Sequence, residues 1–333
     1  MARPEPAGRG LVDPQGRRLT YLRLGVTERC DLRCTYCNVA GASSDGGDEL
    51  SLAELTTLGV AFARHLGFHK LRLTGGEPLL RADLAGIVRA MRDEAGFARI
   101  ALTTNGRLLA GHVRELAAAG VQQVNVSLDT LCAGAYREVR GADALDDVLR
   151  GIDAALAVGR LRVKVNVVLL RSVGFAEFDS FLAWGAGRPI DLRFIELMPI
   201  EGLDEFHRRE HVSGEPLIAR IVDRGFEPQE SEPDAGPAAV YARPGDPLRV
   251  GFVSAITRPF CERCNRLRVA PRGALKLCLF GRGFVDLRPF LARGPAAVAE
   301  VVRRAIALRE DGFRSVGRPV GCEAERGMRG IGG

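Results

Sequence analysis

The sequence lacks any long apolar run, and it begins without an apolar segment. A membrane-spanning helix requires about 18 or more consecutive apolar residues, and no uninterrupted apolar stretch approaches that length. The polar start, with Arg3, Glu5 and Arg9, has no hydrophobic region of the kind found in a secretory signal peptide. We therefore expect a cytoplasmic protein without membrane contact. Internal repeats of the solenoid type are absent as well.

Histidine is scarce, whereas cysteine occurs eight times. In a cytoplasmic protein, cysteines indicate metal ligands before they indicate disulfides. Six of the eight fall into two groups of three. Cys132 is expected to be a small buried residue at the start of a helix, and Cys322 has no assigned role.

The overall composition is that of an ordinary globular protein. Apolar residues make up 46% and charged residues 26% of the 333 positions, enough for one large core or two smaller ones. The formal net charge of +6 is compatible with an anionic substrate, with nucleic acid or with a plainly solvated surface. The positions of particular arginines are therefore more informative than the total charge.

Strand-like and helix-like patterns alternate from about residue 19 to 197, which predicts an α/β fold with a parallel sheet. A doubly wound sheet and a partial barrel both fit, because the strand order cannot be derived from the sequence. Ser51 and Glu54 predict a capping box for the first helix. The expected strands are 19–26, 70–74, 100–103, 122–128, 162–170 and 191–197, and the expected helices are 52–66, 84–94, 113–119, 145–158 and 175–184. Further on, the sequence predicts loop and turn at 229–247, strands at 248–253 and 267–269, and a helix within 296–308.

Polar residues and glycines gather where the expected strands end. Thr103 ends the third strand, Ser127 lies near the end of the fourth, and Met198 follows the sixth. In both architectures, function lies at the carboxyl ends of the strands. The fifth strand carries Lys164 on the face opposite to its valines, and a buried charge of this kind needs a partner. A barrel lumen that holds an anion would supply one.

Cys30, Cys34 and Cys37 form a C-x3-C-x2-C array in the loop after the first expected strand. Iron–sulfur clusters are held by cysteine thiolates, usually four of them. Three thiolates leave one metal position open, and an open position is where chemistry can take place. A zinc loop and a chance spacing are the alternatives.

The second group consists of Cys261, Cys264 and Cys278, which again supply three thiolates. A zinc site would need a fourth ligand, and the five histidines all lie far upstream. We therefore favour a second cluster with an open iron. Arg266 and Arg268 lie between these cysteines with the spacing of one strand face, which suits a polyphosphate, although a solvated strand face is the alternative.

The segment Gly-Gly-Glu-Pro at 75–78 follows the second expected strand. Two glycines allow a backbone to approach a ligand closely. Glu77 could accept hydrogen bonds from an ammonium group or from ribose hydroxyls. A simple turn is the alternative interpretation.

Together these motifs resemble the radical S-adenosylmethionine (SAM) superfamily. The resemblance rests on the first cysteine array, with Tyr36 before its last cysteine, and on the segment 75–78. The second array, the Asn-Arg-Leu-Arg segment at 265–268 and the terminal Gly332 and Gly333 resemble one family within it, the GTP 3′,8-cyclases of molybdenum-cofactor biosynthesis.

The resemblance covers about residues 21–333 and implies a fold. This fold is an incomplete (β/α)6 barrel of the triosephosphate-isomerase type with a C-terminal α+β domain that closes the barrel mouth. The radical SAM core would span residues 13–198, and the auxiliary-cluster domain with its Gly-Gly tail would span 199–333. The loop 38–48 departs from the family's usual sequence, so its shape is not implied.

The resemblance also implies roles for matching residues. Two [4Fe-4S] clusters would be held by the two trios, Cys30, Cys34 and Cys37, and Cys261, Cys264 and Cys278. SAM would be bound by Tyr36, Gly76, Ser127 and Met198. GTP would be bound by Arg23, Arg72, Thr103, Lys164, Arg266 and Arg268, and the tail residues Gly332 and Gly333 would reach into the active site.

The implied activity is that of a lyase that converts GTP into (8S)-3′,8-cyclo-7,8-dihydroguanosine 5′-triphosphate by way of a 5′-deoxyadenosyl radical. The implied partners are GTP, an electron donor and a downstream cyclic pyranopterin monophosphate synthase, with no nucleic acid and no membrane. A homodimer is compatible with the sequence. Two other functions stay open: a different radical SAM enzyme with an auxiliary cluster, acting on a peptide or another nucleotide, and a zinc-dependent nucleic-acid-binding protein.

Overall fold

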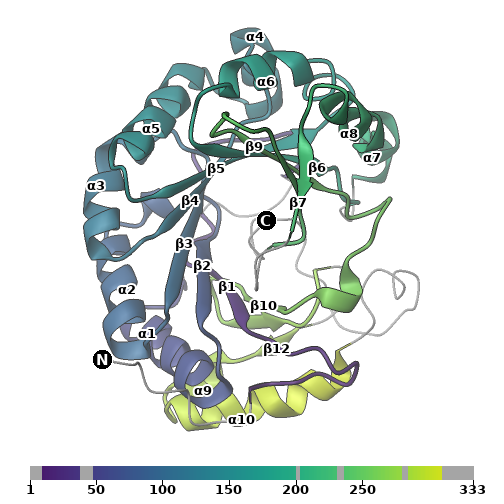
Figure 1. The fold of residues 1–333 in the computed structure, drawn as a ribbon. Coiled ribbons are helices and arrows are strands. Elements are labelled where there is room, and N and C mark those ends of the chain that lie inside the picture. The colour runs from purple at the N-terminus through teal and green to yellow at the C-terminus, as the bar shows by residue number, and fades with distance from the viewer. Residues whose placement is uncertain (1–9, 38–47, 200–202, 231–235, 280–283, 310–333) are drawn as a thin grey trace.

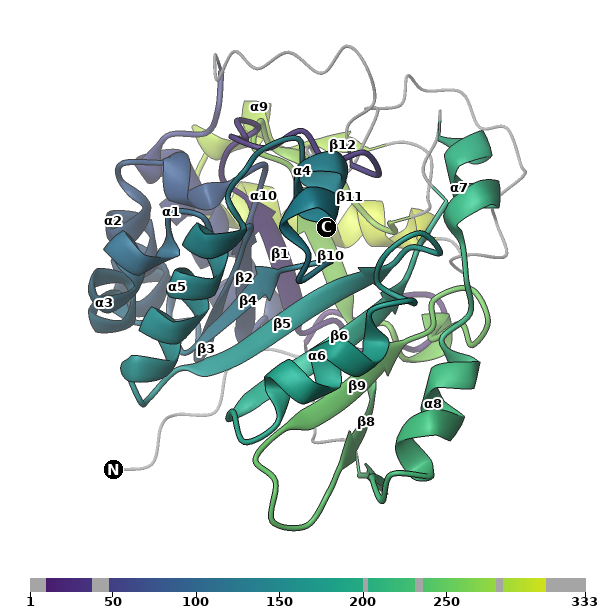
Figure 2. The same ribbon diagram turned by 90° about the horizontal axis from the view of Figure 1, so that it is seen from above.

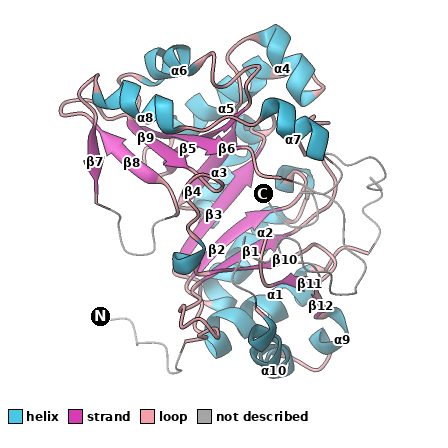
Figure 3. Ribbon diagram, turned by 90° about the vertical axis from the view of Figure 1, so that its right-hand side faces the viewer, coloured by secondary structure: helices cyan, strands magenta, loops and turns pink. Residues whose placement is uncertain are grey.

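The computed structural model describes residues 10–37, 48–199, 203–230, 236–279 and 284–309. Within these residues, twelve strands form one continuous sheet. The sheet curves into an open barrel with helices on its outer side (Figure 1), and a view from the side shows the same layering (Figure 3). The loop 38–47, Cys322, Gly332 and Gly333 lie outside the described residues.

Six parallel strands form the centre of the sheet and follow one another in chain order. They are β1 (Tyr21–Gly25), β2 (Lys70–Thr74), β3 (Arg99–Thr104), β4 (Gln123–Ser127), β5 (Arg162–Leu169) and β6 (Ile190–Glu196). A doubly wound sheet would reverse the strand order at a switch point. The uninterrupted order therefore confirms the incomplete barrel.

The C-terminal part of the chain extends this sheet at both edges. β9 (Arg249–Val253) pairs in parallel with β6, and β10 (Arg266–Val269) pairs in parallel with β1. Antiparallel strands follow on each side: β8 (Ala239–Ala242) and β7 (Glu227–Gln229) beyond β9, and β11 (Ala274–Lys276) and β12 (Val285–Asp286) beyond β10. In the part of the chain that the structure describes, β7 and β12 do not pair, so the barrel stays open. The boundary at 198/199 stays a prediction, and the sheet is continuous across it.

Helices connect the central strands and cover the outer face of the barrel. They are α1 (Leu52–Val60), α2 (Leu84–Ala90), α3 (Leu109–Ala119), α4 (Ala133–Arg140), α5 (Leu145–Ala157) and α6 (Phe178–Gly185). α1 and α2 continue in π-helical turns, η1 (Ala61–His65) and η3 (Met91–Ala95). The predicted capping box is present: Ser51 Oγ accepts from the Glu54 N–H at 3.3 Å, and the Glu54 carboxylate accepts from the Ser51 N–H at 2.8 Å.

The remaining helices belong to the C-terminal part. They are α7 (Asp204–Glu210), α8 (Glu215–Val222), α9 (Arg288–Leu291) and α10 (Pro295–Ala305), with the 3-10 turns η4 (Cys261–Arg263) and η5 (Ile306–Leu308). A further 3-10 turn, η2 (Pro78–Leu80), follows β2 in the first half of the barrel. α7 and α8 lie on the side of β6 and β9, away from α1 to α3 (Figure 2). Among the described helices, none is both long and apolar enough to cross a bilayer.

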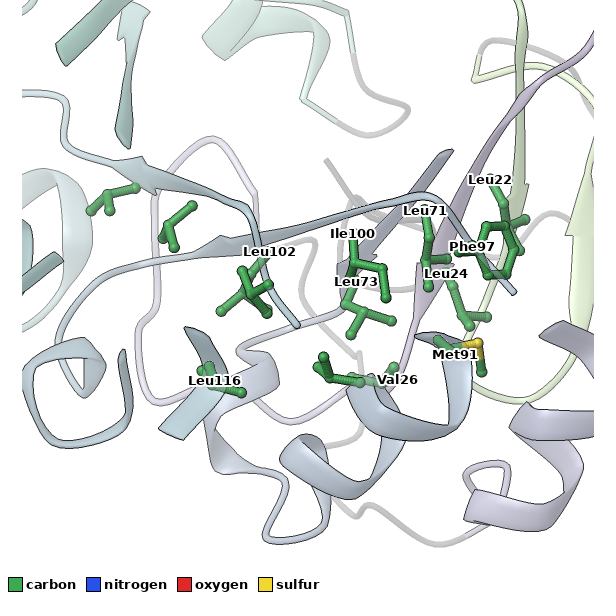
Figure 4. Packing of buried hydrophobic residues seen from close by; sticks show 14 of the residues in the cluster. Leu22, Leu24, Val26, Leu71, Leu73, Met91, Phe97, Ile100, Leu102 and Leu116 are labelled. Atoms are coloured by element: carbon green, nitrogen blue, oxygen red, sulfur yellow. The ribbon is translucent and has the colours of Figure 1, made fainter. Parts of the chain in front are cut away.

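The period of two along each strand separates an apolar outer face from a polar lumen. Leu22 and Leu24 of β1 and Leu71 and Leu73 of β2 are fully buried in the main hydrophobic cluster. They point towards the helices, where Met91 packs beside them (Figure 4). The alternate residues of the same strands face the lumen and are mostly charged or polar. The outer face therefore stabilises the fold, and the inner face is available for ligands.

Two expectations are wrong. The segment 229–247 is not entirely loop and turn, because β8 lies within it and pairs with β9. Cys132 is exposed rather than buried, since it is the N-cap residue of α4 and precedes the first helical turn.

Candidate active site

The carboxyl ends of the barrel strands surround a cavity of about 190 Å³. The three cysteines of the first array line this cavity. It is also lined by the four residues expected to bind SAM, namely Tyr36, Gly76, Ser127 and Met198, and by Thr103 from the expected GTP set. The structure thus brings these residues together at the place that parallel-strand folds use for function. Their individual roles stay predictions.

The two glycines at the end of β2 allow the cysteine loop to lie directly against this strand. The N–H of Gly76 donates to the carbonyl of Thr27 at 2.7 Å, and the N–H of Glu77 donates to the carbonyl of Arg29 at 2.7 Å. A Cβ on Gly76 would lie 2.1 Å from the Arg29 carbonyl oxygen. The glycine is therefore required because two backbones meet here. The close approach that we expected for a ligand is made by the cysteine loop itself.

Glu77 does not reach the cavity. Its buried carboxylate accepts hydrogen bonds from Thr104 Oγ1 at 2.7 Å, from the Asn105 N–H at 2.6 Å and from the Leu79 N–H at 3.0 Å. Burial raises the pKa of this carboxyl group to about 7, against the opposing effect of these hydrogen bonds. The interpretation of Glu77 as a contact for an ammonium group or for ribose is wrong in this structure. The residue instead ties the end of β2 to the end of β3.

A buried polar network lies behind the first cysteine array. Tyr36 donates its hydroxyl proton to Asp129 Oδ2 at 2.7 Å, and the same oxygen lies 2.8 Å from Arg140 Nη2. Arg140 Nη1 donates to the sulfur of Cys34 at 3.4 Å. The second oxygen of Asp129 accepts from the Val168 N–H at 2.9 Å. Arg140 of α4 thus places a positive charge against Cys34. Asp129 orients this guanidinium group and is itself held by the backbone of β5.

The second cysteine trio lies at the opposite end of the barrel strands. Cys261 and Cys264 precede β10, and the antiparallel pairing of β10 with β11 brings the segment that contains Cys278 back beside the start of β10. Burial raises the pKa of Cys264, but the positive charges of Arg266 and Arg309 outweigh it and lower the pKa to about 6. The thiolate, which is the form that binds metals, is therefore favoured at neutral pH.

A row of cations occupies the lumen between the two trios. The parallel ladders place Arg23 of β1 opposite Arg268 of β10 on one side and opposite Arg72 of β2 on the other. Burial, followed by the neighbouring Arg266, lowers the pKa of Arg268 to about 10. Burial and the charges of Arg268 and Arg72 also lower the pKa of Arg23. Like charges held in this way indicate a binding place for an anion.

Several polar atoms of the lumen are buried without a hydrogen-bond partner among the described residues. They include Nε of Arg72, Nε of Arg268, Oγ1 of Thr103 and the hydroxyl of Tyr21. Buried polar groups in folded proteins are normally satisfied. Three of these four residues were expected to contact GTP, so their unused donors suit a ligand that supplies oxygen acceptors.

Lys164 also faces the lumen, where it forms an ion pair with Asp191. Its Nζ lies 3.1 Å from Asp191 Oδ2, and the same oxygen accepts from Arg162 Nε at 2.9 Å. Burial, followed by the charge of Arg193, lowers the pKa of Lys164 to about 6. The prediction that this lysine needs a partner is confirmed. Its low pKa means that a second negative charge would still be favourable there.

The two trios are separated by the length of the barrel strands. Cys30 follows the carboxyl end of β1, whereas Cys264 precedes the amino end of β10, and the two strands run parallel in register. A five-residue strand spans roughly 17 Å. A single ligand that reaches both ends must therefore lie extended along the lumen, past the arginine row.

Both trios suit an iron–sulfur cluster by the chemistry of their donors. Each offers three thiols, and a cation contacts a sulfur in each: Arg140 at Cys34 and Arg309 at Cys264. Within the described ranges, no three cysteine, histidine or acidic side chains are placed to hold a single metal ion. The donors of both trios are therefore of the type that holds such clusters.

Sequence reasoning missed several residues of the site. Arg140 and Asp129, behind Cys34, and Arg309, beside Cys264, were not among the candidates. Arg193 is buried and lines a basic cavity of about 400 Å³ with Lys164, at the amino ends of the strands. The alternation of Arg193 with apolar residues in β6 could have indicated it. Arg309 had no comparable signal, because only the tertiary fold brings it to the cysteines.

An open parallel barrel, with a cysteine trio in the loop after its first strand, defines the class of radical SAM proteins. Residues 24–185 match the Radical SAM superfamily, and residues 190–315 match the family Molybdenum Cofactor Synthesis C. Among solved structures, Streptococcus suis SuiB bound to S-adenosylmethionine has a similar fold, with a TM-score of 0.59 and 15% identity over 86% of this chain and 68% of that one.

Relatives of higher sequence identity identify one family within this class. A GTP 3′,8-cyclase from Haemophilus influenzae is 41% identical over 84% of this chain and 84% of that protein. A GTP 3′,8-cyclase from Cronobacter sakazakii is 44% identical over 90% of this chain and 91% of that protein. The chain belongs to the GTP 3′,8-cyclase family.

Proposed function

We propose that this protein is a radical SAM lyase that converts GTP into (8S)-3′,8-cyclo-7,8-dihydroguanosine 5′-triphosphate, the first step of molybdenum-cofactor biosynthesis. The observation that carries the proposal is the cationic lumen between two cysteine trios at opposite ends of the same strands. This arrangement suits an extended anionic nucleotide. The name of the relatives at 41% and 44% identity identifies that nucleotide as GTP.

The lumen would bind SAM at the carboxyl ends of the strands. Cys30, Cys34 and Cys37 would hold one [4Fe-4S] cluster, and Tyr36, Gly76, Ser127 and Met198 would surround SAM in the cavity that they line. When bound, the cluster and SAM supply the radical that takes a hydrogen atom from the substrate, and the protein positions and shields the reactants. The buried Arg140 and Asp129 keep the cysteine loop in place.

GTP would bind in the middle of the lumen and towards the amino ends of the strands. Arg23, Arg72, Thr103, Lys164, Arg266 and Arg268 would contact the nucleotide, and Cys261, Cys264 and Cys278 would hold a second [4Fe-4S] cluster near the guanine. The cations neutralise the triphosphate in a site of low dielectric, where such contacts are strong. Fixing both the sugar and the base holds C3′ and C8 close to each other, which lowers the entropic part of the barrier. Gly332 and Gly333, outside the described residues, would complete the site.

Anaerobic reconstitution tests this proposal directly. Iron and sulfide are counted first, and GTP, SAM and a reductant are then supplied. The expected result is two clusters per chain, with 5′-deoxyadenosine and the cyclised nucleotide formed together. A protein that holds zinc and no iron would contradict the proposal. So would formation of 5′-deoxyadenosine that is independent of GTP and is accompanied by no cyclised nucleotide.

The remaining partners follow from the same proposal. The enzyme requires an electron donor, and its product passes to a cyclic pyranopterin monophosphate synthase. We expect it in the cytoplasm, without nucleic-acid or membrane partners and with a homodimer as the candidate assembly. A radical SAM enzyme acting on a peptide is the nearest rival, and the product assay with GTP distinguishes the two.

A further inference from the structure

Two arginines from opposite ends of the described chain converge on the second cysteine trio. Arg17 precedes β1, and Arg309 follows η5. Arg17 Nη1 donates to the carbonyl of Cys261 at 2.8 Å. Arg309 Nη2 donates to the carbonyl of Cys264 at 3.1 Å and lies 3.5 Å from the sulfur of the same residue.

Arg309 also contacts both segments that carry the trio, namely the segment that ends at Cys264 (the Cys264 arm) and the segment that ends at Cys278 (the Cys278 arm). Its Nε donates to the carbonyl of Leu277, the residue before Cys278, at 3.1 Å. Its Nη2 lies 3.2 Å from the carbonyl of Arg266 at the start of β10. One guanidinium group therefore contacts both the Cys264 arm and the Cys278 arm. Because the five donors of a guanidinium group are fixed in a plane, these contacts set the distance between the arms.

Asp13 holds both arginines. Its Oδ2 accepts from Arg309 Nη1 at 2.7 Å and from Arg17 Nε at 2.6 Å. Its Oδ1 accepts from the backbone N–H groups of Gln15 at 3.1 Å and Arg17 at 2.9 Å. The side chain of Asp13 is fully buried, and that of Arg309 is 2% exposed. Such an arrangement is costly unless every group is paired, and here every acceptor of the carboxylate is used.

We propose that Arg309, oriented by Asp13, is a positioning residue for the second trio: it fixes the Cys264 and Cys278 arms and donates a hydrogen bond to the Cys264 sulfur. This inference rests on the proposed function, because it assumes that the trio holds an iron–sulfur cluster. A hydrogen bond and a positive charge next to a cluster sulfur stabilise the reduced form, which carries more negative charge. Arg309 therefore makes the second cluster both better retained and easier to reduce.

The test uses a full-length parent in which Cys30→Ala, Cys34→Ala and Cys37→Ala remove the first site. Arg309→Gln, Arg309→Lys and Asp13→Asn are compared in this parent. Arg304→Gln is the matched control, because Arg304 lies on α10 with an 80% exposed side chain and pairs only with Glu300 in the described structure. The readouts are the midpoint potential of the cluster, its resistance to an iron chelator, and the thermal transition of the apo-protein.

In Arg309→Gln we expect the midpoint potential to become more negative and resistance to the chelator to fall by about tenfold or more, as for other residues that hydrogen-bond to a metal ligand. In Arg309→Lys the midpoint potential should lie between those of the parent and Arg309→Gln, because lysine keeps the positive charge but lacks the planar donors of the guanidinium group. Asp13→Asn keeps the side-chain shape but loses the charged acceptor that orients Arg309, so it should also lower the resistance to the chelator, and it tests the positioning role even if Arg309→Gln does not fold.

Two results would overturn the inference in different ways. If the parent holds iron, and Arg309→Gln and Asp13→Asn match Arg304→Gln in potential and chelator resistance, only the positioning role is wrong. If the parent holds no iron at the second trio, the two-cluster function is wrong and the inference fails with it.

Discussion

Arg23 of β1 lies directly opposite Arg268 of β10 in the parallel ladder that joins these two strands. On its other side, Arg23 is opposite Arg72. Segments from both ends of the chain thus place three guanidinium groups in one row of the lumen. Their mutual repulsion is relieved when an anion enters, so ligand binding should also stabilise the folded protein.

Arg268→Ala should weaken GTP binding by about 1.5–3 kcal/mol, the range for a hydrogen bond to a charged group. Arg266→Ala should act in the same direction. Anaerobic titration calorimetry measures both. Arg293→Ala, which removes an exposed arginine outside the lumen, serves as the control and should bind GTP as the parent does. An unchanged affinity in Arg268→Ala would remove this residue from the site.

GTP binding should take up a proton at Lys164 near pH 7.5. In the free protein the pKa of Lys164 lies at about 6 rather than 10.5, owing to burial and to the charge of Arg193, so the amine is mostly neutral at this pH. A bound triphosphate favours the ammonium form and raises the pKa. The affinity should therefore be greatest below about pH 6 and fall as the pH rises. Calorimetry in buffers of different ionisation enthalpy measures the uptake.

Lys164→Arg is the matched control for this proton uptake. Arginine stays protonated across the whole range, so the variant should bind GTP with less proton uptake and a flatter pH profile. Protons taken up by the phosphate itself are common to both proteins and cancel in the comparison. Equal uptake in both proteins would mean that Lys164 is already charged before GTP binds.

Cys34→Ala should abolish reductive cleavage of SAM, since the first trio loses a ligand. Cys264→Ala should spare the first cluster and leave uncoupled SAM cleavage, while cyclisation of GTP stops. Chromatographic measurement of 5′-deoxyadenosine and of the cyclised nucleotide distinguishes the two effects. Full cyclase activity in both variants would refute the two-cluster account.

Gly76→Ala should disturb SAM binding, because the new Cβ would lie 2.1 Å from the Arg29 carbonyl oxygen in the cysteine loop. Equilibrium binding of SAM to the reconstituted protein measures the loss. Gly111→Ala on α3 is the control: a Cβ there meets no atom within 4 Å, and alanine should stabilise the helix by up to about 1 kcal/mol. Normal SAM binding in Gly76→Ala would show that the loop can move aside.

Local patterns predicted the central strands well. The alternation of leucine with charged residues in Lys70–Thr74 sets both the strand and its two faces, and the observed bounds of β2 equal the expected ones. The capping box at Ser51 was likewise predictable, because it depends on residues three apart. Signals of this kind are contained within one element.

The edges of the sheet and the support of the cysteines were not predictable in this way. β10 pairs with β1, and β9 with β6, although nothing in these short strands indicates their partners. The sequence predicts a ligand contact at Glu77, yet its carboxylate accepts a hydrogen bond from the Asn105 N–H after the next strand. Arg309 is brought to Cys264 only by the tertiary fold, since the two residues are far apart in the sequence. Such contacts depend on tertiary geometry, which a single sequence does not display.

The placement of β10 next to β1 also has a consequence for biosynthesis. While the polypeptide is still emerging from the ribosome, one side of β1 has no neighbour, because β10 is among the last strands to be made. An unpaired strand edge is prone to intermolecular association. The nascent chain thus exposes this edge of β1 until β10, in its final third, has been translated.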